Sequence, residues 1–421
     1  MATVKEFGAL RFTEKAGAKG ELCCPPYDII SAEEKENFLN NNSFNIIRLE
    51  LPEQSDAGYV LAGDTLEKWV NDGILAKDQS DCLYVYEEKF TVKGVNYSFK
   101  GIVARVKLHP FSDGVVLPHE ETLSKAKTDR LNLMSATGCN FSQIYSLYSD
   151  SERKSSALIE EMSKGNPDTC FTDGEGVTHS LWVVKKSDKT EALCRFFDDK
   201  KLYIADGHHR YETALNYQKQ LKEQGISCPD ADYIMMFLID MENDGLVVFP
   251  THRIVRDLEA LDEEKLLKDC GENFFVEPCC ECEIEGKLEI AYKEGKKSFG
   301  FVGKNKTAIL TLKDIAVMNK FLPDASSALK GLDVSVLHTL ILENVLGIDK
   351  ENMAKQINLT YTRVFDEAVS AAKGKANCAF ILNPTRVEEI AAVSAAGEKM
   401  PQKSTYFYPK LITGLVMNKM K

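Results

Sequence analysis

The stretch LYIADGHHRYETAL, residues 202–215, decides the fold of this chain because two kinds of periodicity meet within it. Leu202, Tyr203 and Ile204 form a short apolar run that predicts a buried strand. Tyr211 and Ala214 then fall on one face of the helix that the following residues predict. A strand that turns directly into a helix is typical of proteins in which helices pack on a sheet.

Strand-like and helix-like segments alternate on both sides of this stretch. Residues 82–108 predict an antiparallel strand pair, and residues 141–148 and 233–240 predict further strands. We also expect helices over residues 119–135, 335–346 and 361–372, and a turn at residues 243–245 that leads the chain back into residues 246–249. The pattern predicts an α+β (mixed α/β) fold with an N-terminal lobe, residues 1–255, and a C-terminal α/β lobe, residues 256–421. It leaves open whether segment 403–410 returns to the functional site.

Charge limits the classes of ligand. The chain has 421 residues, with 52 Lys and Arg against 64 Asp and Glu, and a formal net charge of −12. Such a charge repels polyanions, so we expect neither nucleic acid nor a membrane surface as a partner. A small anionic substrate then needs a locally basic pocket, and the oligomeric state stays open.

The N-terminal sequence, the apolar runs and the cysteine spacing indicate the compartment and the state of the cysteines. The N-terminal residues lack a signal-peptide core, and no run approaches the roughly 18 apolar residues of a membrane helix, so we expect a cytoplasmic protein. The 12 cysteines are then expected mainly as free thiols. The cluster Cys279–Cys282 lacks a CxxC pair, which favours a structural role over a metal site.

The DGHHR turn, residues 206–210, contains the largest group of adjacent candidate functional residues. Gly207 lets the backbone turn tightly and lets a ligand approach, and Asp206 is the expected N-cap. His208, His209 and Arg210 then lie at the positive end of a helix, which binds anions. Arginine matches phosphate with a planar fork, and histidine exchanges protons near neutral pH. The alternative is an N-capping Asp followed by surface histidines.

The stretch LPHEET, residues 117–122, is a second candidate site. His119 and Glu120 are suited to acid–base work, and Glu120 is a candidate Mg²⁺ ligand. Arg130 follows on the same predicted helix as a candidate phosphate ligand. The alternatives are a helix N-terminus enriched in acidic residues and a plain surface ion pair between Asp129 and Arg130.

Three further segments supply candidate binding residues. They are His252 and Arg253 after a predicted strand, Tyr27 and Asp28 in a proline-rich loop, and Lys403, Ser404 and Thr405 near the C-terminus. A polar loop, a turn and an aromatic strand packed in the core are the respective alternatives. The Walker, Rossmann, nucleophile-elbow and kinase motifs are missing, and we find no flavin, NAD or haem signature.

Several long motifs together resemble one bacterial family. LPHEETLSKAKTDRLNLM (117–134), YIADGHHRYETAL (203–215), THRIV (251–255) and MPQKSTYFYPKLITGLV (400–416) are similar to the family catalogued as domain of unknown function ten-fifteen. The similarity spans nearly the whole chain. The family name itself implies no activity.

The DGHHR box also resembles the phosphate-binding box of the ParB and sulfiredoxin superfamily, which includes a free-serine kinase. That resemblance implies a ParB/sulfiredoxin-like core, and it assigns Asp206–Arg210 to phosphate binding and transfer. The catalytic cysteine of sulfiredoxin has no counterpart here, which argues against a redox role. With the serine-kinase relative, the resemblance implies serine or phosphoserine as the small molecule.

Together these observations lead to one functional hypothesis and two alternatives. We expect a phosphotransfer enzyme, a kinase or phosphatase, with Asp206, His208, His209, His119 and Glu120 as candidate catalytic residues. The candidate cofactors are Mg²⁺ and an adenine nucleotide, ATP or ADP. The alternatives are a non-catalytic regulator that binds a nucleotide or metabolite, and a ParB-like DNA-associated NTPase or nuclease. The net charge argues against the second alternative.

Overall fold

The computed structural model describes residues 1–122 and 124–420, whose contacts divide into two compact units. Unit 1 comprises Met1–Pro118, Thr122–Leu246 and Pro409–Lys421, and unit 2 comprises His119–Glu121 and Val247–Tyr408. The chain therefore enters unit 2 twice and ends in unit 1. The domain boundary placed at residues 255–256 stays a prediction.

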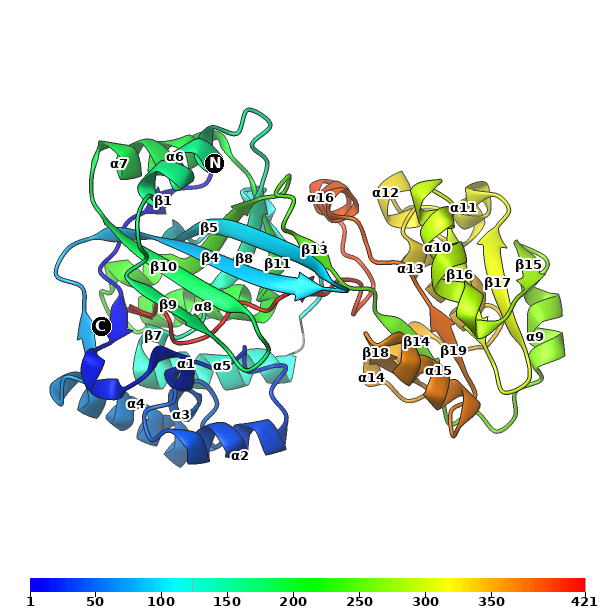
Figure 1. Ribbon diagram of the computed structural model, residues 1–421, viewed down its shortest axis with the longest axis horizontal. Helices are drawn as coiled ribbons and strands as arrows, with labels where there is room; N and C mark the ends of the chain where they lie inside the picture. Colours follow the sequence, from blue (N-terminus) through cyan, green and yellow to red (C-terminus); the bar gives the residue numbers. More distant parts are fainter. Residues whose placement is uncertain (123, 421) are drawn as a thin grey trace. The chain divides into compact units, whose positions relative to one another are not determined.

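A nine-stranded mixed sheet forms the centre of unit 1, in the order β6-β11-β8-β12-β5-β4-β10-β9, with β1 paired to β5 (Figure 1). Its strands are β1 (Val4–Lys5), β4 (Cys82–Val92), β5 (Val95–Lys107), β6 (Val116–Leu117), β8 (Ile144–Tyr148), β9 (Thr169–Thr172), β10 (Thr178–Lys185), β11 (Leu202–Asp206) and β12 (Tyr233–Asp240). The antiparallel pair β4–β5 confirms the prediction for residues 82–108. The pairs β6–β11 and β8–β12 are parallel, so the mixed α/β fold class is confirmed.

Helices close the main core of unit 1. They are α6 (Lys154–Met162), α7 (Asp188–Phe196) and α8 (His208–Glu223). Ile159, Leu193 and Tyr211 of these helices join the same apolar cluster as Met236 and Leu238 of β12. β12 is buried on both faces, which explains why its residues form a continuous apolar run rather than an alternating one.

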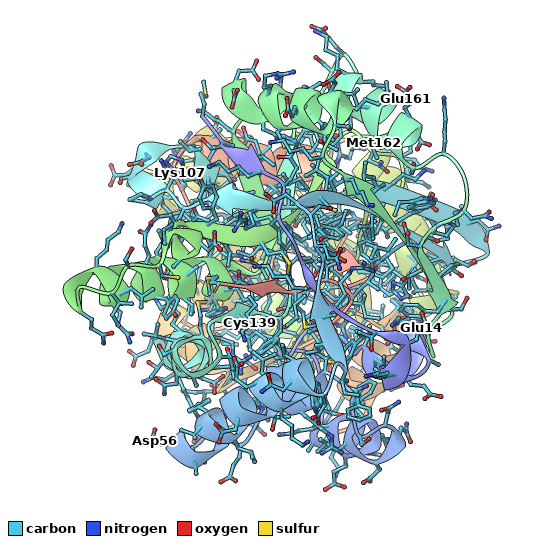
Figure 2. All side chains as sticks on the ribbon, turned by 90° about the vertical axis from the view of Figure 1, so that its left-hand side faces the viewer. Glu14, Asp56, Lys107, Cys139, Glu161 and Met162 are labelled. Carbon is cyan, nitrogen blue, oxygen red and sulfur yellow. A yellow bond between two sulfur atoms is a disulfide. The ribbon has the colours of Figure 1, made fainter. Side chains whose placement is uncertain are left out.

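A second apolar cluster of unit 1 lies among the N-terminal helices. These are α1 (Lys19–Leu22), α2 (Ala32–Asn41), α3 (Ile47–Glu50) and α4 (Asp56–Asn71), together with α5 (Ser124–Thr137). Ser31 and Glu34 form a capping box at the start of α2. Figure 2 shows Asp56 on the outside of this layer, whereas Cys139 lies inside it and is buried.

Unit 2 has helices on both faces of a six-stranded antiparallel sheet. The strands, in sheet order, are β15 (Phe274–Pro278), β17 (Thr307–Leu312), β16 (Ser298–Val302), β19 (Cys378–Ile381), β14 (His252–Val255) and β18 (Leu359–Thr362). The helices are α9 (Glu263–Cys270), α10 (Ile284–Lys293), α11 (Met318–Phe321), α12 (Ser327–Lys330), α13 (Asp333–Val336), α14 (Lys350–Lys355), α15 (Phe365–Lys373), α16 (Val387–Ala395) and the π-helix η7 (Leu337–Glu343). Ile254 and Val255 of β14 point into two different apolar clusters, one on each face.

Three two-stranded pairs complete the fold. They are β2 (Leu10–Phe12) with β3 (Leu75–Lys77), β7 (Cys139–Asn140) with β21 (Asn418–Lys419), and β13 (Val247–Val248) with β20 (Phe407–Tyr408). None of the helices that the structure describes combines the length and the apolar character that crossing a bilayer requires.

Several predicted elements differ from the structure. The turn at residues 243–245 forms, but it does not lead back onto β12, because β13 pairs with β20. Gly245 packs directly against the backbone of Ser98 in β5, where a Cβ would overlap the Ser98 carbonyl oxygen. The helix expected over residues 119–135 begins only at Ser124, and residue 123 lies outside the described residues. The helix expected over residues 361–372 begins at Phe365, because residue 361 belongs to β18.

Most described cysteines carry free thiols. Ten are free, and Cys280 and Cys282 form a disulfide. Within residues 1–122 and 124–420, no three His, Cys, Asp or Glu side chains group closely enough to hold a metal ion.

A buried network of polar side chains connects β4 and β10. Tyr86 donates a hydrogen bond to Oε1 of Glu88 at 2.6 Å, and its hydroxyl oxygen lies 2.7 Å from Nδ1 of His179. Nε2 of His179 lies 3.0 Å from a carboxylate oxygen of Asp173. Burial lowers the pKa of His179, but hydrogen bonds and attraction to Asp173 and Glu88 outweigh it and raise the pKa to about 9.

We expect His179→Gln to remove a pH-dependent part of the stability. The pKa rises from 6.5 to about 9 on folding, so the charged ring contributes about 3 kcal/mol to the free energy of unfolding. A raised folded-state pKa means that this contribution is complete below pH 6.5 and is lost as the pH rises through 9. Urea titrations at pH 6 and pH 9 measure it as the difference between wild type and variant. An equal pH slope in both proteins would contradict the assignment.

Candidate functional site

The DGHHR turn lies in unit 1, where strand β11 ends and helix α8 begins. β11 lies between β6 and β8, and Gly207 connects its last residue to α8. Gly207 has a left-handed backbone, with φ 97° and ψ 27°, a conformation that favours glycine. The strand-to-helix turn is confirmed, but the N-cap assignment of Asp206 is wrong. Gly207 is the N-cap, and no side chain at that position caps the helix.

Gly207 also makes a close approach to the guanidinium of Arg210. A Cβ at position 207 would lie 2.9 Å from Nη2 of Arg210 and 3.0 Å from Cζ and Nε. A residue with a side chain would therefore displace the guanidinium. The arginine charge lies at the N-terminal end of α8, where the helix dipole is also positive.

The carboxylate of Asp206 accepts hydrogen bonds from two cations. Nη2 of Arg210 donates to Oδ2 at 2.6 Å, and Nζ of Lys410 donates to Oδ1 at 2.5 Å. Burial alone would raise the pKa of Asp206, but attraction to Lys410, Arg210 and His208 outweighs burial and holds the pKa well below its ordinary value. Asp206 is therefore ionised at neutral pH, and no local sequence pattern indicates its pairing with Lys410.

Arg130 is buried rather than exposed in a surface ion pair. Its Nε and Nη2 donate to Oδ2 of Asp129 at 2.8 and 2.7 Å, and its Nη1 donates to the Glu50 carbonyl at 2.7 Å. Its guanidinium lies 4.2 Å from the ring centroid of Tyr27, a cation–π contact. The surface alternative for the Asp129–Arg130 pair is therefore wrong, while the role of Arg130 in substrate binding stays a prediction.

Glu50 is a buried carboxylate near Arg130 and Arg210 that no sequence motif marks. It is 3% exposed, and Ser142 donates a hydrogen bond to Oε1 at 3.1 Å. Burial raises the pKa of Glu50, although attraction to Arg130 and Arg210 opposes the rise. Glu50 is the last residue of α3 and belongs to no recognisable motif. Only its buried surroundings in the structure identify it as a residue of this site.

A small cavity separates these side chains. It has a volume of about 30 Å³ and is lined by Glu50, Arg130, Ser142, Arg210 and mostly apolar neighbours. This volume suits a water molecule rather than a metabolite. Nη1 of Arg210 donates to the Gln143 carbonyl at 2.5 Å, so the guanidinium is held from both sides. The buried cluster therefore positions the guanidinium of Arg210.

The other predicted residues of unit 1 differ in exposure. His208 is buried, His209 and Tyr27 are partly exposed, and Asp28 is exposed. The roles of these four residues stay predictions.

Unit 2 brings the HEE motif, residues 119–121 of the LPHEET stretch, together with the segment 403–410. Nε2 of His119 lies 3.0 Å from Oγ1 of Thr405, and Oε1 of Glu120 accepts a hydrogen bond from the amide of Lys403 at 3.4 Å. The amide of Met400 donates to the His119 carbonyl at 2.7 Å. Two motifs about 280 residues apart in sequence are thus neighbours. Their catalytic and binding roles stay predictions.

The remaining predicted residues of unit 2 also have protein partners. Nδ1 of His252 accepts a hydrogen bond from the amide of Leu382 at 3.2 Å. The hydroxyl of Ser404 donates to the Pro401 carbonyl. Arg253 is 1% exposed, and its guanidinium bonds to the backbone carbonyls of Thr251 and Lys403.

Comparison with known proteins adds a family and several distant structures. A family model described as "Protein of unknown function (DUF1015)" matches residues 4–335. No curated protein matches the sequence. A free serine kinase in complex with AMP matches with a TM-score of 0.36 and 15% identity, over 73% of this chain and 88% of that chain.

Two other solved structures match at a comparable level. SbnI from Staphylococcus aureus, with a C-terminal truncation, has a TM-score of 0.35 and 12% identity over 74% of this chain and 87% of its own. A conserved hypothetical protein from Pyrococcus furiosus has a TM-score of 0.33 and 16% identity over 70% and 87%. The family match covers more than half of the chain and includes the HEE, DGHHR and THRIV motifs, so the chain belongs to the DUF1015 family.

Proposed function

We propose that the protein is a phosphotransfer enzyme that acts on a small phosphorylated or hydroxylated metabolite and holds its phosphate at the start of α8. One observation carries the proposal. A left-handed Gly207 leads into a 16-residue helix that no side chain at its N-cap position caps, and two cations, Arg210 and Lys410, lie beside the turn. Successive backbone amides in such a turn form a concave anion site.

The charges around the turn favour an anionic ligand. The one carboxylate of the motif, Asp206, is ionised and paired with Arg210 and Lys410. Two full positive charges and the helix dipole thus face one negative charge. A phosphate bound here would be stabilised by the helix dipole and by these cations, within a chain whose net charge is −12.

Phosphoryl transfer needs little from a protein beyond position and charge. A hydroxyl oxygen of the acceptor, or water, forms a bond to phosphorus as the bond to the leaving oxygen breaks with its electron pair. Gly207 and Arg210 would hold the phosphoryl oxygens, and the partly exposed His209 would accept or donate the proton. His208 and Asp206 would orient the turn.

The finer assignments belong to the same proposal. Serine or phosphoserine is the proposed small molecule, and ATP or ADP the proposed second substrate. Further binding residues would be Arg130, Tyr27 and Asp28. In unit 2, the proposed participants are His119, Glu120, His252, Arg253, Lys403, Ser404 and Thr405. Mg²⁺ would bind mainly to nucleotide phosphates with one carboxylate such as Glu120, because Mg²⁺ keeps several waters in sites of this kind.

A second candidate function is regulation by ligand binding without catalysis. It is favoured by the guanidinium of Arg210, whose Nη1 and Nη2 already bond to Gln143 and Asp206. An arginine engaged in this way shapes a binding site, and it has fewer donors left for a migrating phosphoryl group.

A ligand panel with product analysis tests the proposal. Thermal shifts are measured with ATP, ADP, AMP, serine and phosphoserine, with and without Mg²⁺, and stabilising combinations are followed by ³¹P NMR. We expect product formation, and we expect His209→Ala to lower turnover at least about 100-fold in a protein that still unfolds cooperatively. His109→Ala is the matched control, since His109 lies outside the turn and contacts Asp113.

The outcomes separate the two functions. Stabilisation without product under every condition supports the regulator. Turnover by His209→Ala at the wild-type rate contradicts the proposed role of the turn.

A further inference from the structure

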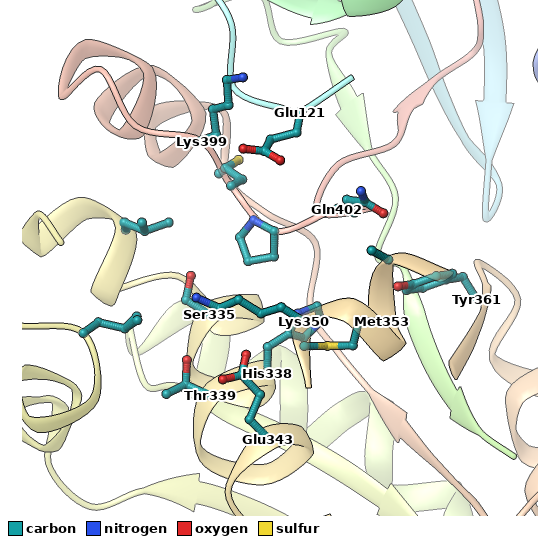
Figure 3. Close-up of a pocket in the computed structure, with 15 residues that line it drawn as sticks. Glu121, Ser335, His338, Thr339, Glu343, Lys350, Met353, Tyr361, Lys399 and Gln402 are labelled. Atoms are coloured by element: carbon teal, nitrogen blue, oxygen red, sulfur yellow. The ribbon is translucent and has the colours of Figure 1, made fainter. Parts of the chain in front are cut away.

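A second cavity, which the proposed function does not use, lies within unit 2. It has a volume of about 310 Å³, at the lower end of the range of about 300–1,000 Å³ found for small-molecule sites. All 15 of its lining residues belong to unit 2 (Figure 3). Its walls combine apolar side chains such as Leu322, Met353 and Met400 with a few polar groups.

The π-helix η7 builds the floor of this cavity. Residues 335–346 are predicted as an ordinary helix, but after α13 the chain continues as a π-helix over Leu337–Glu343. His338, Thr339 and Glu343 of this segment line the cavity (Figure 3). π-Helical turns are rare and frequently lie at functional sites.

One residue in the wall of the cavity carries a buried hydroxyl that has no hydrogen-bond partner among the described residues. Ser335 is 3% exposed and lines the cavity, and among the described residues its Oγ has no hydrogen-bond partner. A buried polar group in this state costs free energy, and native proteins seldom keep one without a reason. A ligand oxygen placed in the cavity would accept this hydrogen bond.

The buried cation Arg253 lies directly behind two lining residues. Its Nε donates to Nε2 of His338 at 3.3 Å, and its guanidinium lies 5.5 Å from the ring centroid of Tyr361. Its other hydrogen bonds go to the carbonyls of Thr251 and Lys403. Within residues 1–122 and 124–420, no carboxylate forms an ion pair with it. A buried charge without a counter-charge is costly, and a bound anion would compensate it.

The hydrogen bond from Arg253 leaves the His338 ring with one hydrogen-bond donor. Because Nε2 accepts from Arg253, the proton of the neutral ring lies on Nδ1. Burial and the repulsion of Arg253 lower the pKa of His338 well below its usual value, so the ring is neutral at pH 7. Burial also lowers the pKa of Arg253 to about 10, and the guanidinium stays charged.

The charges at the edge of the cavity cancel one another. Lys350 and Lys399 contribute two positive charges, and Glu121 and Glu343 contribute two negative charges. Burial raises the pKa of Glu343, and attraction to Lys350 opposes part of this rise. The charge of Arg253 is therefore the one left over, and a single negative charge on the ligand would balance it.

We propose that this cavity binds a small organic monocarboxylate, whose apolar body lies against Met353 and Met400 and whose carboxylate is turned toward Ser335 and His338. The site is independent of the phosphate site at α8. Its lining has both parts that such a ligand needs, an apolar wall and hydrogen-bond donors backed by a buried cation.

Calorimetric titration of the full chain with phenylacetate, and with its uncharged counterpart 2-phenylethanol, tests the charge requirement. We expect saturable binding of phenylacetate at least tenfold tighter than that of the alcohol. Phenylalanine, which adds an ammonium group, is expected to bind more weakly than phenylacetate. Equal binding of acid and alcohol, or binding of phenylalanine alone, would overturn the proposal.

Three substitutions locate the binding. Ser335→Ala is expected to weaken phenylacetate at least fivefold without lowering the melting temperature, because the hydroxyl it removes has no protein partner. Ala354→Trp, at an exposed lining position, is expected to abolish binding by filling the cavity. Lys350→Gln is expected to weaken binding at least threefold. Its control, Lys355→Gln, lies on the same helix but pairs with Glu351, and it should leave binding unchanged.

Two results would exclude binding of phenylacetate in this cavity. If phenylacetate binds equally to wild type and to folded Ala354→Trp, it binds elsewhere and the proposal is wrong. No saturable binding to the wild type also overturns it.

Discussion

Asp206→Asn is expected to lower the free energy of unfolding by about 3 kcal/mol at pH 7, because removing one partner of a buried ion pair leaves the others uncompensated. Asp206 accepts hydrogen bonds from both Arg210 and Lys410, and the side chains of both cations are only 10% exposed. Asparagine keeps the shape of the side chain but not its charge. Equilibrium unfolding in urea measures the loss.

The pH dependence of the free energy of unfolding provides a second test of the ion pairs of Asp206. The folded-state pKa of Asp206 is lowered, so its contribution is present above the unfolded-state pKa and is lost as the pH falls toward the folded-state value. Wild type should therefore lose stability below about pH 4 more steeply than Asp206→Asn does. Parallel curves would show that the carboxylate is not held in its ionised form by the two cations.

A surface pair is the matched control for this substitution. Asp72 forms an ion pair with Lys68, and its side chain is 49% exposed. Asp72→Asn should change the free energy of unfolding by less than about 0.5 kcal/mol, because exposed pairs contribute little. Adding Lys410→Met to Asp206→Asn should recover part of the loss, since it removes one of the unpaired cations.

Gly207→Ala is expected to have the second largest effect, a loss of about 2–3 kcal/mol. The left-handed backbone, with φ 97°, costs an alanine about 1–2 kcal/mol. The new Cβ would also lie 2.9 Å from Nη2 of Arg210, so the guanidinium must leave its position against Asp206. Urea denaturation measures the total, and the weakened anion site should appear as a smaller thermal shift with phosphoserine.

Gly94→Ala separates the two parts of this cost. Gly94 also has a positive φ, 80°, but a Cβ there has nothing within 4 Å. It should therefore show the backbone cost alone. If Gly94→Ala and Gly207→Ala destabilise the protein equally, the contact with Arg210 does not constrain position 207.

Local patterns predicted the elements but not the contacts between distant segments. The apolar run of residues 233–240 and the periodicity after Arg210 predicted β12 and α8 from neighbouring residues alone. The pairing of Asp206 with Lys410 joins residues that are 204 positions apart, and no local pattern encodes it. Gly207 was expected in a tight turn, whereas its contact with Arg210 became visible only in three dimensions.

Two features were beyond local patterns for different physical reasons. Residues 335–346 carry the apolar character of a buried helix, and over so short a segment that character does not distinguish α-helical from π-helical turns. Arg253 follows a strand-like segment and was expected to bind substrate, but the surrounding sheet and helices bury it. The burial of a strand residue depends on the elements that pack on the strand, and the sequence of the strand alone does not determine them.

Amide chemical shifts test the central claim, phosphate binding at the Gly207 turn, most directly. The chain has 26 glycines and seven histidines, so selective ¹⁵N labelling of these two residue types reports on the turn within a small set of signals. On titration with phosphoserine, we predict saturable downfield shifts of the amide protons of Gly207, His208 and His209, with the other glycine and histidine signals unchanged. Saturable shifts confined to other positions, or no shifts at millimolar phosphoserine, would contradict the account.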